Sequence, residues 1–179
     1  MNLRIISGKF GGRTISAPDG RLTHPMGDRI RGSLFNIIND ELDGAEVLDV
    51  FAGTGSLGLE SLSRGAKHAT FVERDRVASR ILNENIKSLG VEYSTTAIQI
   101  GLGTFIDKNQ DKSYDVIFAD PPYNDLQLST VARLGGMLKP NGLMLLSYPG
   151  RSELPPVNGV VVVDNRSYGT AALALYRKK

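Results

Sequence analysis

Residues 47–58 read VLDVFAGTGSLG, an apolar run that passes into glycines and then becomes apolar again. The run over 47–52 predicts a buried parallel strand, and residues 56–64 predict a helix that stops at Gly65. Glycines between a strand and a helix permit a tight turn and let a ligand touch the backbone. The stretch therefore predicts the first strand, turn and helix of a nucleoside-binding α/β sheet.

The alternation of strand and helix continues along the rest of the sequence. Further strands are predicted at 69–73, 95–100, 115–119 and 143–147, and a closing hairpin pairs 160–163 with 171–176 around 165–169. Helices are predicted at 76–89, between the cap Asp75 and Gly90, at 104–108, and at 126–138, where residues 139–142 end the last one. This alternation predicts a Rossmann-like α/β fold, with a mostly parallel seven-stranded sheet and helices on both faces.

Residues 1–44 do not follow this alternation. Residues 4–15 predict a β-hairpin that turns at glycines. Asp28 is expected to cap a helix that carries Ile30, Leu34, Ile37 and Ile38 on one face. We therefore predict two parts, an N-terminal extension over 1–44 and a larger domain over 45–179.

Charge is distributed unevenly along the chain. Residues 1–31 hold six Arg or Lys and two Asp, a balance of +4, whereas all 179 residues together have a net charge of +2. A basic segment on a slightly acidic body is typical of a protein that binds a polyanion, although a solvated basic surface would look the same.

Composition excludes several kinds of site. The chain has no cysteine, which excludes disulfides, thiolate zinc sites and a cysteine nucleophile. Its two histidines, His24 and His68, lie far apart, so no metal site is expected. It has no apolar run long enough for a membrane span, and its first residues are not expected to act as a secretory leader. We expect a cytoplasmic, monomeric protein.

Two carboxylates frame the glycine turn. Glu73 ends the second predicted strand, about twenty residues after Gly53, where it could accept the hydroxyls of a ribose. Asp49 precedes the turn and suits the cationic methionine end of S-adenosylmethionine (SAM), whereas it would repel the pyrophosphate of NAD. Two other interpretations stay open, in which the glycines serve only helix packing and Asp49 caps the amides of the turn.

The sequence Asp120-Pro121-Pro122-Tyr123 follows the fourth predicted strand, beside the crevice in which such sheets bind ligands. An exocyclic nucleobase amine is a poor nucleophile because its lone pair is delocalised into the ring. The Asp120 carboxylate and the Pro121 carbonyl could hold its two N–H groups and direct the lone pair at a methyl group, while Tyr123 stacks on the base. The alternative is a strand stopped by prolines and followed by a turn.

These motifs resemble the RsmD family of bacterial methyltransferases. The resemblance rests on RIISGKFGGR at 4–13, DRIR at 28–31, LFNI at 34–37, LDVFAGTGSLGLESLSRGA at 48–66, FVE at 71–73 and DPPY at 120–123. It implies a class I SAM-dependent methyltransferase that modifies the N2 amine of one guanine in 16S ribosomal RNA. The substrate would be a small-subunit assembly intermediate, and S-adenosylhomocysteine would be the product.

The resemblance and the motifs together assign three sets of residues. The catalytic set is Asp120, Pro121, Pro122 and Tyr123. The cofactor set is Asp49, Phe51, Ala52, Gly53, Thr54, Gly55, Gly58, Glu73, Arg74, Gln99, Ile100, Gly101 and Asp120. The candidate RNA contacts are Arg4, Lys9, Arg13, Arg29 and Arg31.

The chain departs from the family pattern in three places. Residues 24–27 read HPMG where Arg-Pro-Thr-Thr is usual. No acidic residue follows the third predicted strand, so adenine recognition would rest on backbone groups or on Gln99. Ser147 stands where an acidic residue is common after the fifth strand.

Other functions would use parts of the same pattern. A DNA adenine-N6 methyltransferase could use DPPY, but it normally needs a larger target-recognition domain. Glutamine methyltransferases favour Asn at the position of Asp120. A nucleic-acid-binding module with a vestigial pocket would have no need of Asp49, Glu73, Asp120 and Tyr123.

Overall fold

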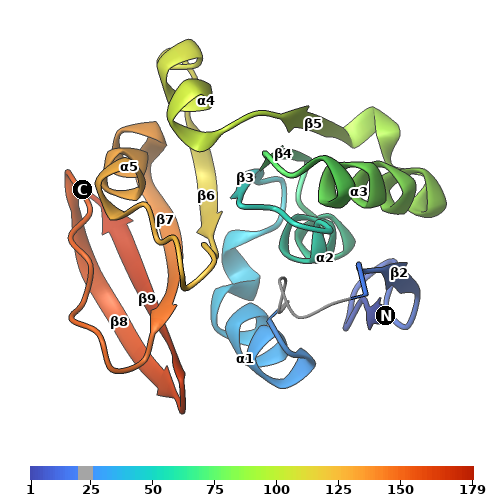
Figure 1. Cartoon of the computed structure of the whole chain (residues 1–179), viewed down its shortest axis with the longest axis horizontal. Helices are drawn as coiled ribbons and strands as arrows, with labels where there is room; N and C mark the ends of the chain where they lie inside the picture. Colours follow the sequence, from blue (N-terminus) through green and yellow to red (C-terminus); the bar gives the residue numbers. More distant parts are fainter. Residues whose placement is uncertain (20–25) are drawn as a thin grey trace.

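The computed structural model describes residues 1–19 and 26–179 and contains a seven-stranded sheet with helices on both faces (Figure 1). The strands lie in the order β5-β4-β3-β6-β7-β9-β8. Their bounds are β3 Glu46–Val50, β4 His68–Glu73, β5 Thr95–Gln99, β6 Tyr114–Ala119, β7 Leu138–Pro149, β8 Val160–Tyr168 and β9 Ala171–Lys178. The strands β3 to β7 run parallel, and β9 is antiparallel to both β7 and β8. The predicted fold class is confirmed.

Two buried clusters cover the two faces of the sheet. On one face, Phe35 of α1 (Asp28–Ile38), Leu59 of α2 (Ser56–Ser63) and Leu82 of α3 (Arg76–Leu89) share a core with residues of the sheet. On the other face, Phe105 of α4 (Leu102–Lys108) packs in a second core with Val131 of α5 (Leu128–Val131). The strand order reverses between β3 and β6, and this switch point is where open α/β sheets form a ligand crevice.

The helix α3 illustrates how local sequence sets a boundary. The Asp75 side chain accepts a hydrogen bond from the Ala78 nitrogen at 2.8 Å, and Gly90 ends the helix with φ 68°. A carboxylate cap satisfies a free amide at the start, and a left-handed residue at the end is tolerated best by glycine. Both predicted ends of this helix are confirmed.

The helix predicted at 126–138 is shorter than expected. Only α5 is α-helical, and Ala132–Met137 continue as a 3-10 helix (η3). The paired glycines at 135–136 weaken the helix, and a Cβ on Gly135 would lie 1.9 Å from the Asn158 carbonyl oxygen, so the chain passes very close to that backbone. Residues 139–142, which were predicted to end this helix, belong to β7.

The predicted loop at 165–169 is also wrong. β8 continues to Tyr168, and the two strands turn at Gly169 and Thr170, where Gly169 has φ 70°. β8 is an edge strand whose side chains are mostly exposed, so its polar residues did not indicate a strand.

The N-terminal extension begins with a two-stranded hairpin, β1 (Asn2–Arg4) and β2 (Thr14–Ser16), as predicted. The expected cap of α1 is wrong, because Gly27 is the N-cap without a side-chain bond, and the carboxylate of Asp28 accepts a hydrogen bond from Arg31 at 2.9 Å. In the described part of the chain, no helix is long and apolar enough to cross a membrane.

The extension packs directly on the sheet domain. Its residues Ile5, Ile15 and Phe35 belong to the same buried cluster as Val47 and Leu59. The boundary at 44/45 therefore does not separate two cores, and the assignment of 1–44 and 45–179 as functional units stays a prediction.

Candidate active site

A cavity of about 790 Å³ lies at the carboxyl ends of β3, β4 and β6. The glycine turn contributes Phe51, Ala52, Gly53 and Thr54, and the DPPY turn contributes Asp120 to Tyr123. The extension and the β8–β9 hairpin also reach it, with Ala17, Pro18, Met26, Gly27, Ile30, Thr170, Ala171 and Leu173. The two motifs identified in the sequence therefore meet in one cavity, and the N-terminal extension and the β8–β9 hairpin help to enclose it.

Asp49 is a buried carboxylate in the wall of this cavity, with a side chain that is 1% exposed. Its Oδ2 accepts a hydrogen bond from the Gly58 nitrogen at 3.0 Å, so Asp49 does cap an amide at the start of α2. Burial raises the pKa of Asp49 well above its usual range, and the nearby carboxylates Asp120 and Glu73 raise it further. A cation in the cavity would relieve this repulsion.

Glu73 joins the glycine turn to the turn that follows its own strand, β4. Its Oε2 accepts from the Gly53 nitrogen and its Oε1 from the Asp75 nitrogen, both at 2.8 Å. A carboxylate has about four lone-pair positions, so two remain to accept hydroxyl groups. The carboxylate is thus held in place before any ligand arrives.

The glycines of the turn have different roles. Gly53 has φ 57° and lines the cavity, and a Cβ there would meet no atom within 4 Å. A Cβ on Gly55 would lie 2.5 Å from Leu82, and one on Gly58 would lie 2.3 Å from the ring of Phe71. Gly55 and Gly58 are not among the residues that line the cavity, and the close approach of Leu82 and Phe71 supports the packing interpretation for them. Their contact with a cofactor stays a prediction.

Tyr123 is hydrogen-bonded to a residue of the neighbouring strand β7. The hydroxyls of Tyr123 and Ser147 are 3.0 Å apart. Burial raises the pKa of Asp120 to about 6, and the hydroxyl of Ser147 opposes that rise. Asp120 is therefore mainly ionised at neutral pH but takes up a proton readily.

Some of the other predicted cofactor residues lie in the cavity wall, and others lie outside it. Phe51, with φ 56°, lies in the cavity wall, and so do Ala52, Thr54, Arg74 and Ile100. Gln99 is exposed and lies outside the wall, although it pairs with Glu73 in register, and Gly101 is the N-cap of α4. A direct role of Gln99 in adenine recognition has no support in this geometry.

Four of the five predicted RNA contacts are exposed, namely Arg4, Lys9, Arg13 and Arg29. Lys9 and Arg13 lie over the ring of Phe10, 5.5 and 5.9 Å from its centre, which makes a basic patch with an aromatic face. Arg21 and His24 are outside the described residues.

The fifth, Arg31, requires a correction. Its side chain is 1% exposed, and it donates hydrogen bonds to the Arg4 carbonyl and to Asp28. Its Nε lies 4.0 Å from the buried carboxylate of Glu60. A side chain enclosed in this way cannot reach a phosphate, so Arg31 belongs to the packing of the extension.

Three features of the site were missed in the sequence. No local pattern in the sequence indicates that the extension contributes to the cavity wall. Ser147 was noted only as a departure from an acidic pattern. Asn85 of α3 was overlooked, although it bonds the backbone of Ser16 and donates to the Thr54 carbonyl, and so connects β2 to the glycine turn.

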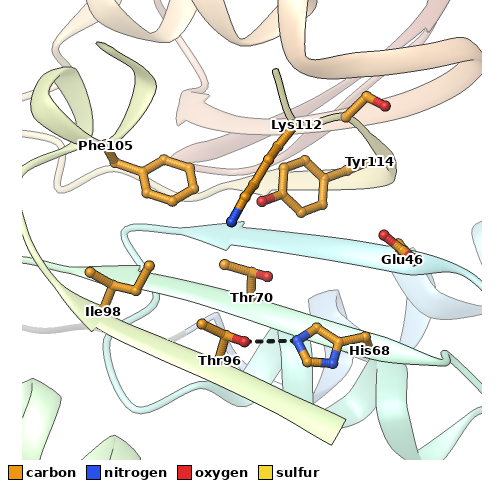
Figure 2. A pocket seen from close by; sticks show the side chains of 9 residues that line it. Glu46, His68, Thr70, Thr96, Ile98, Phe105, Lys112 and Tyr114 are labelled. Atoms are coloured by element: carbon orange, nitrogen blue, oxygen red, sulfur yellow. Dashed lines mark hydrogen bonds between the residues drawn. The ribbon is translucent and has the colours of Figure 1, made fainter. Parts of the chain in front are cut away.

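A second cavity, of about 340 Å³, opens near the amino ends of the same strands (Figure 2). Lys112 extends over the sheet between Phe105 and Tyr114, and below it the His68 Nε2 lies 2.9 Å from the Thr96 hydroxyl. Parallel sheets bind their ligands at the carboxyl ends, so the larger cavity is the candidate active site.

The strand order, together with the glycine turn and the DPPY turn around the larger cavity, defines the class I methyltransferase architecture. The solved structure of yhhF from Escherichia coli superposes with a TM-score of 0.89 at 31% identity, over 100% of this chain and 99% of that one.

Comparison of sequences gives the family. The chain belongs to the family described as "Conserved hypothetical protein 95", whose model matches residues 3–177. It is 33% identical to "Putative rRNA methyltransferase YlbH" of Bacillus subtilis, over 99% of this chain and 100% of the relative. It is 31% identical to "Ribosomal RNA small subunit methyltransferase D" of Haemophilus influenzae, over 98% of this chain and 93% of the relative.

Proposed function

We propose that this protein transfers a methyl group from SAM to the exocyclic N2 amine of one guanine in 16S ribosomal RNA, within the small subunit or an assembly intermediate. The observation that carries the proposal is the convergence of Asp49, Glu73 and Asp120 on one cavity beside an open glycine turn. Three carboxylates in one cavity favour a cationic ligand and disfavour a pyrophosphate. The names of the relatives support ribosomal RNA as the acceptor.

The residues present fit SAM, which would supply an activated, electrophilic methyl group on a sulfonium. The Gly53 turn leaves open space at a position where a side chain would project, so a ligand could lie against its backbone. Glu73, fixed by two backbone amides, would hold the ribose hydroxyls. Asp49 would balance the positive charge of the methionine end.

The DPPY turn would prepare the acceptor amine. The Asp120 carboxylate and the Pro121 carbonyl would hold its two N–H groups, and Tyr123 would stack on the base. As the new N–C bond forms, the bond from the methyl carbon to sulfur would break and leave a neutral thioether, and the nitrogen would become positively charged and have to lose a proton. Asp120, with a pKa of about 6, would be ionised and able to accept it.

The N-terminal extension would hold the RNA backbone. Exposed Arg4, Lys9, Arg13 and Arg29 suit phosphates, and the ring of Phe10 beside two of them suits a base. Because Ala17, Met26 and Ile30 of the same extension line the cavity, the RNA and the reacting base would be held by one continuous surface. Residues 1–44 would thus serve as the RNA-binding unit and 45–179 as the catalytic unit.

The proposal is tested by transfer of labelled methyl from SAM to small ribosomal subunits taken from cells without the enzyme, followed by nucleoside mass spectrometry. Free 16S RNA and duplex DNA are assayed in parallel. We expect N2-methylguanosine from the subunit. Asp120→Ala is expected to abolish transfer while SAM binding persists. Label in N6-methyladenine of DNA, or turnover by Asp120→Ala, would contradict the proposal.

A further inference from the structure

The second cavity, of about 340 Å³, has polar side chains of three neighbouring strands in its wall. On β4, His68 and Thr70 alternate with Ala69, which belongs to the core on the opposite face of the sheet. Thr96 of β5 pairs with Thr70 in register, and Glu46 of β3 pairs with His68, so these four side chains share one face. Parallel strands normally carry apolar residues on both faces, so this polar cluster departs from what packing requires.

The wall above these strands combines aromatic rings with one cation (Figure 2). Phe105 of α4 is 1% exposed and Tyr114 of β6 is 5% exposed, and Lys112 extends between their rings toward the strands. Within residues 1–19 and 26–179, Lys112 forms no ion pair, and nearby Asp115 pairs with Lys139 instead, at 3.2 Å. An ammonium group without a counter-charge over a partly enclosed surface favours an anionic ligand.

The cavity also has hydroxyl groups that its own wall does not use. Among the nine residues drawn in Figure 2, one hydrogen bond is present, between His68 Nε2 and the Thr96 hydroxyl, at 2.9 Å. Thr70 and Tyr114 are 8% and 5% exposed, and the hydroxyl of neither bonds another of these residues. A tyrosine hydroxyl is protonated at neutral pH and can donate a hydrogen bond. An acceptor group on a ligand would therefore meet an ammonium group and two hydroxyls.

We propose that this cavity is a second ligand site, which takes a small organic monoanion with a planar, apolar body, such as an aromatic carboxylate. Lys112 would pair with the carboxylate and Tyr114 would donate a hydrogen bond to it, while the body of the ligand lies against Phe105 and Ile98. A volume of about 340 Å³ lies within the usual range for small-molecule pockets.

The charges of the wall set the charge of the ligand. Lys112 supplies one positive charge and Glu46 one negative charge, so the second charge of a dianion such as a phosphate monoester would be disfavoured. No residue in the described part of the chain lines both cavities, so this site and the candidate active site can be tested separately.

Binding is tested by NMR of protein labelled at histidine, because His68 lies in the wall and the chain has two histidines. His68→Gln assigns the signal. Titration with benzoate at constant pH should shift the His68 signal along a saturable curve, with a dissociation constant on the order of 1 mM for so small a ligand. Acetate, which lacks the planar body, and benzamide, which lacks the charge, should each bind at least about tenfold more weakly. Inorganic phosphate binding more tightly than benzoate would overturn the ligand class, and no saturable shift with benzoate would overturn the site.

Substitution of Lys112 places the bound anion. Lys112→Met removes the ammonium group but keeps a side chain of similar length, and it should weaken benzoate binding at least about tenfold. Tyr114→Phe, which keeps the ring, should weaken binding less, by about fivefold. Lys108→Met is the matched control, because Lys108 is also exposed and ends α4 but does not line the cavity, so its affinity for benzoate should equal that of the natural protein. Equal affinities of Lys112→Met and the natural protein would show that benzoate binds elsewhere and would refute the proposal.

Discussion

Oε1 of Glu60, a carboxylate oxygen inside α2, lies 2.8 Å from the backbone nitrogen of Ile6 in the N-terminal extension. Oε2 of the same residue accepts from the Ser7 nitrogen and from Arg64, both at 3.1 Å. Glu60 is fully buried, and Arg31 approaches it from α1. One carboxylate therefore joins the extension to the helix that begins at the glycine turn.

Glu60→Gln should destabilise the fold markedly. The change leaves the buried Arg31 and Arg64 side chains without their shared counter-charge and replaces an acceptor with a donor. We expect the free energy of unfolding to fall by about 2–4 kcal/mol. Chemical denaturation measures this, and hydrogen exchange should rise at residues 5–13. The exposed pair of Arg80 and Glu84 supplies the control, because Glu84→Gln should cost less than about 0.5 kcal/mol. Equal effects of the two changes would contradict the role of Glu60.

Gly8→Ala should disturb the hairpin of the extension. Gly8 has φ +85°, and a Cβ there would lie 1.9 Å from the Ser63 carbonyl oxygen, so the loop must move off α2. Gly12 is a matched control, with φ +87° and no atom within 4 Å of a Cβ. Gly12→Ala should cost about 1 kcal/mol for the backbone conformation alone, and Gly8→Ala clearly more. Thermal unfolding of both variants decides this, and similar midpoints would show that the close approach to Ser63 is unimportant.

Arg29 and Arg31, two residues apart on α1, should differ in what their substitution changes, stability for Arg31 and RNA binding for Arg29. Arg31 is buried against Glu60, so Arg31→Met should lower the free energy of unfolding by about 2–4 kcal/mol. Arg29 is exposed, so Arg29→Ala should leave stability within about 0.5 kcal/mol. If Arg29 contacts a phosphate, its loss should reduce the salt slope of RNA binding by roughly 1. An unchanged slope would remove Arg29 from the RNA surface.

Asp120→Asn should stabilise the protein at neutral pH. The pKa of Asp120 is raised to about 6 in the fold, so its contribution to stability is complete below the usual pKa of 3.8 and is lost as pH rises through 6. The asparagine variant has no such loss. Relative to the natural protein, its free energy of unfolding should rise by on the order of 1–3 kcal/mol between pH 4 and pH 7.5. Unfolding curves at several pH values measure this, with exposed Asp111→Asn as the control that should stay level. Parallel curves for Asp120→Asn would contradict the raised pKa.

Local signals in the sequence were reliable where one or two residues determine the geometry. Asp75 and Gly90 fix both ends of α3, and the apolar runs of β3 and β6 mark strands that are buried on both sides. The sheet follows from these elements because parallel neighbours need helical connections. Because the carboxyl ends of parallel strands lie on the same side of a sheet, the glycine turn and the DPPY turn could be expected to lie close together.

Other features depend on contacts between distant parts of the chain. Arg31 looks like any exposed cation until Glu60, on another helix, is placed beside it. The need for glycine at position 135 comes from Asn158, and the hydroxyl of Ser147 meets that of Tyr123, which lies in the turn after β6. The polar residues of β8 resemble a loop because an edge strand is open to solvent. No local pattern carries this information.

The position of β9 also affects how the protein can be made. β9 lies between β7 and β8, and its residues Ala171 and Leu173 close part of the cavity wall. A growing chain therefore displays both functional turns long before the cavity can close. During that interval β7, with its apolar residues 143–146, is an unpaired edge strand that can associate with other chains. A chain without β9 would thus have an incomplete cavity wall and an exposed edge on β7.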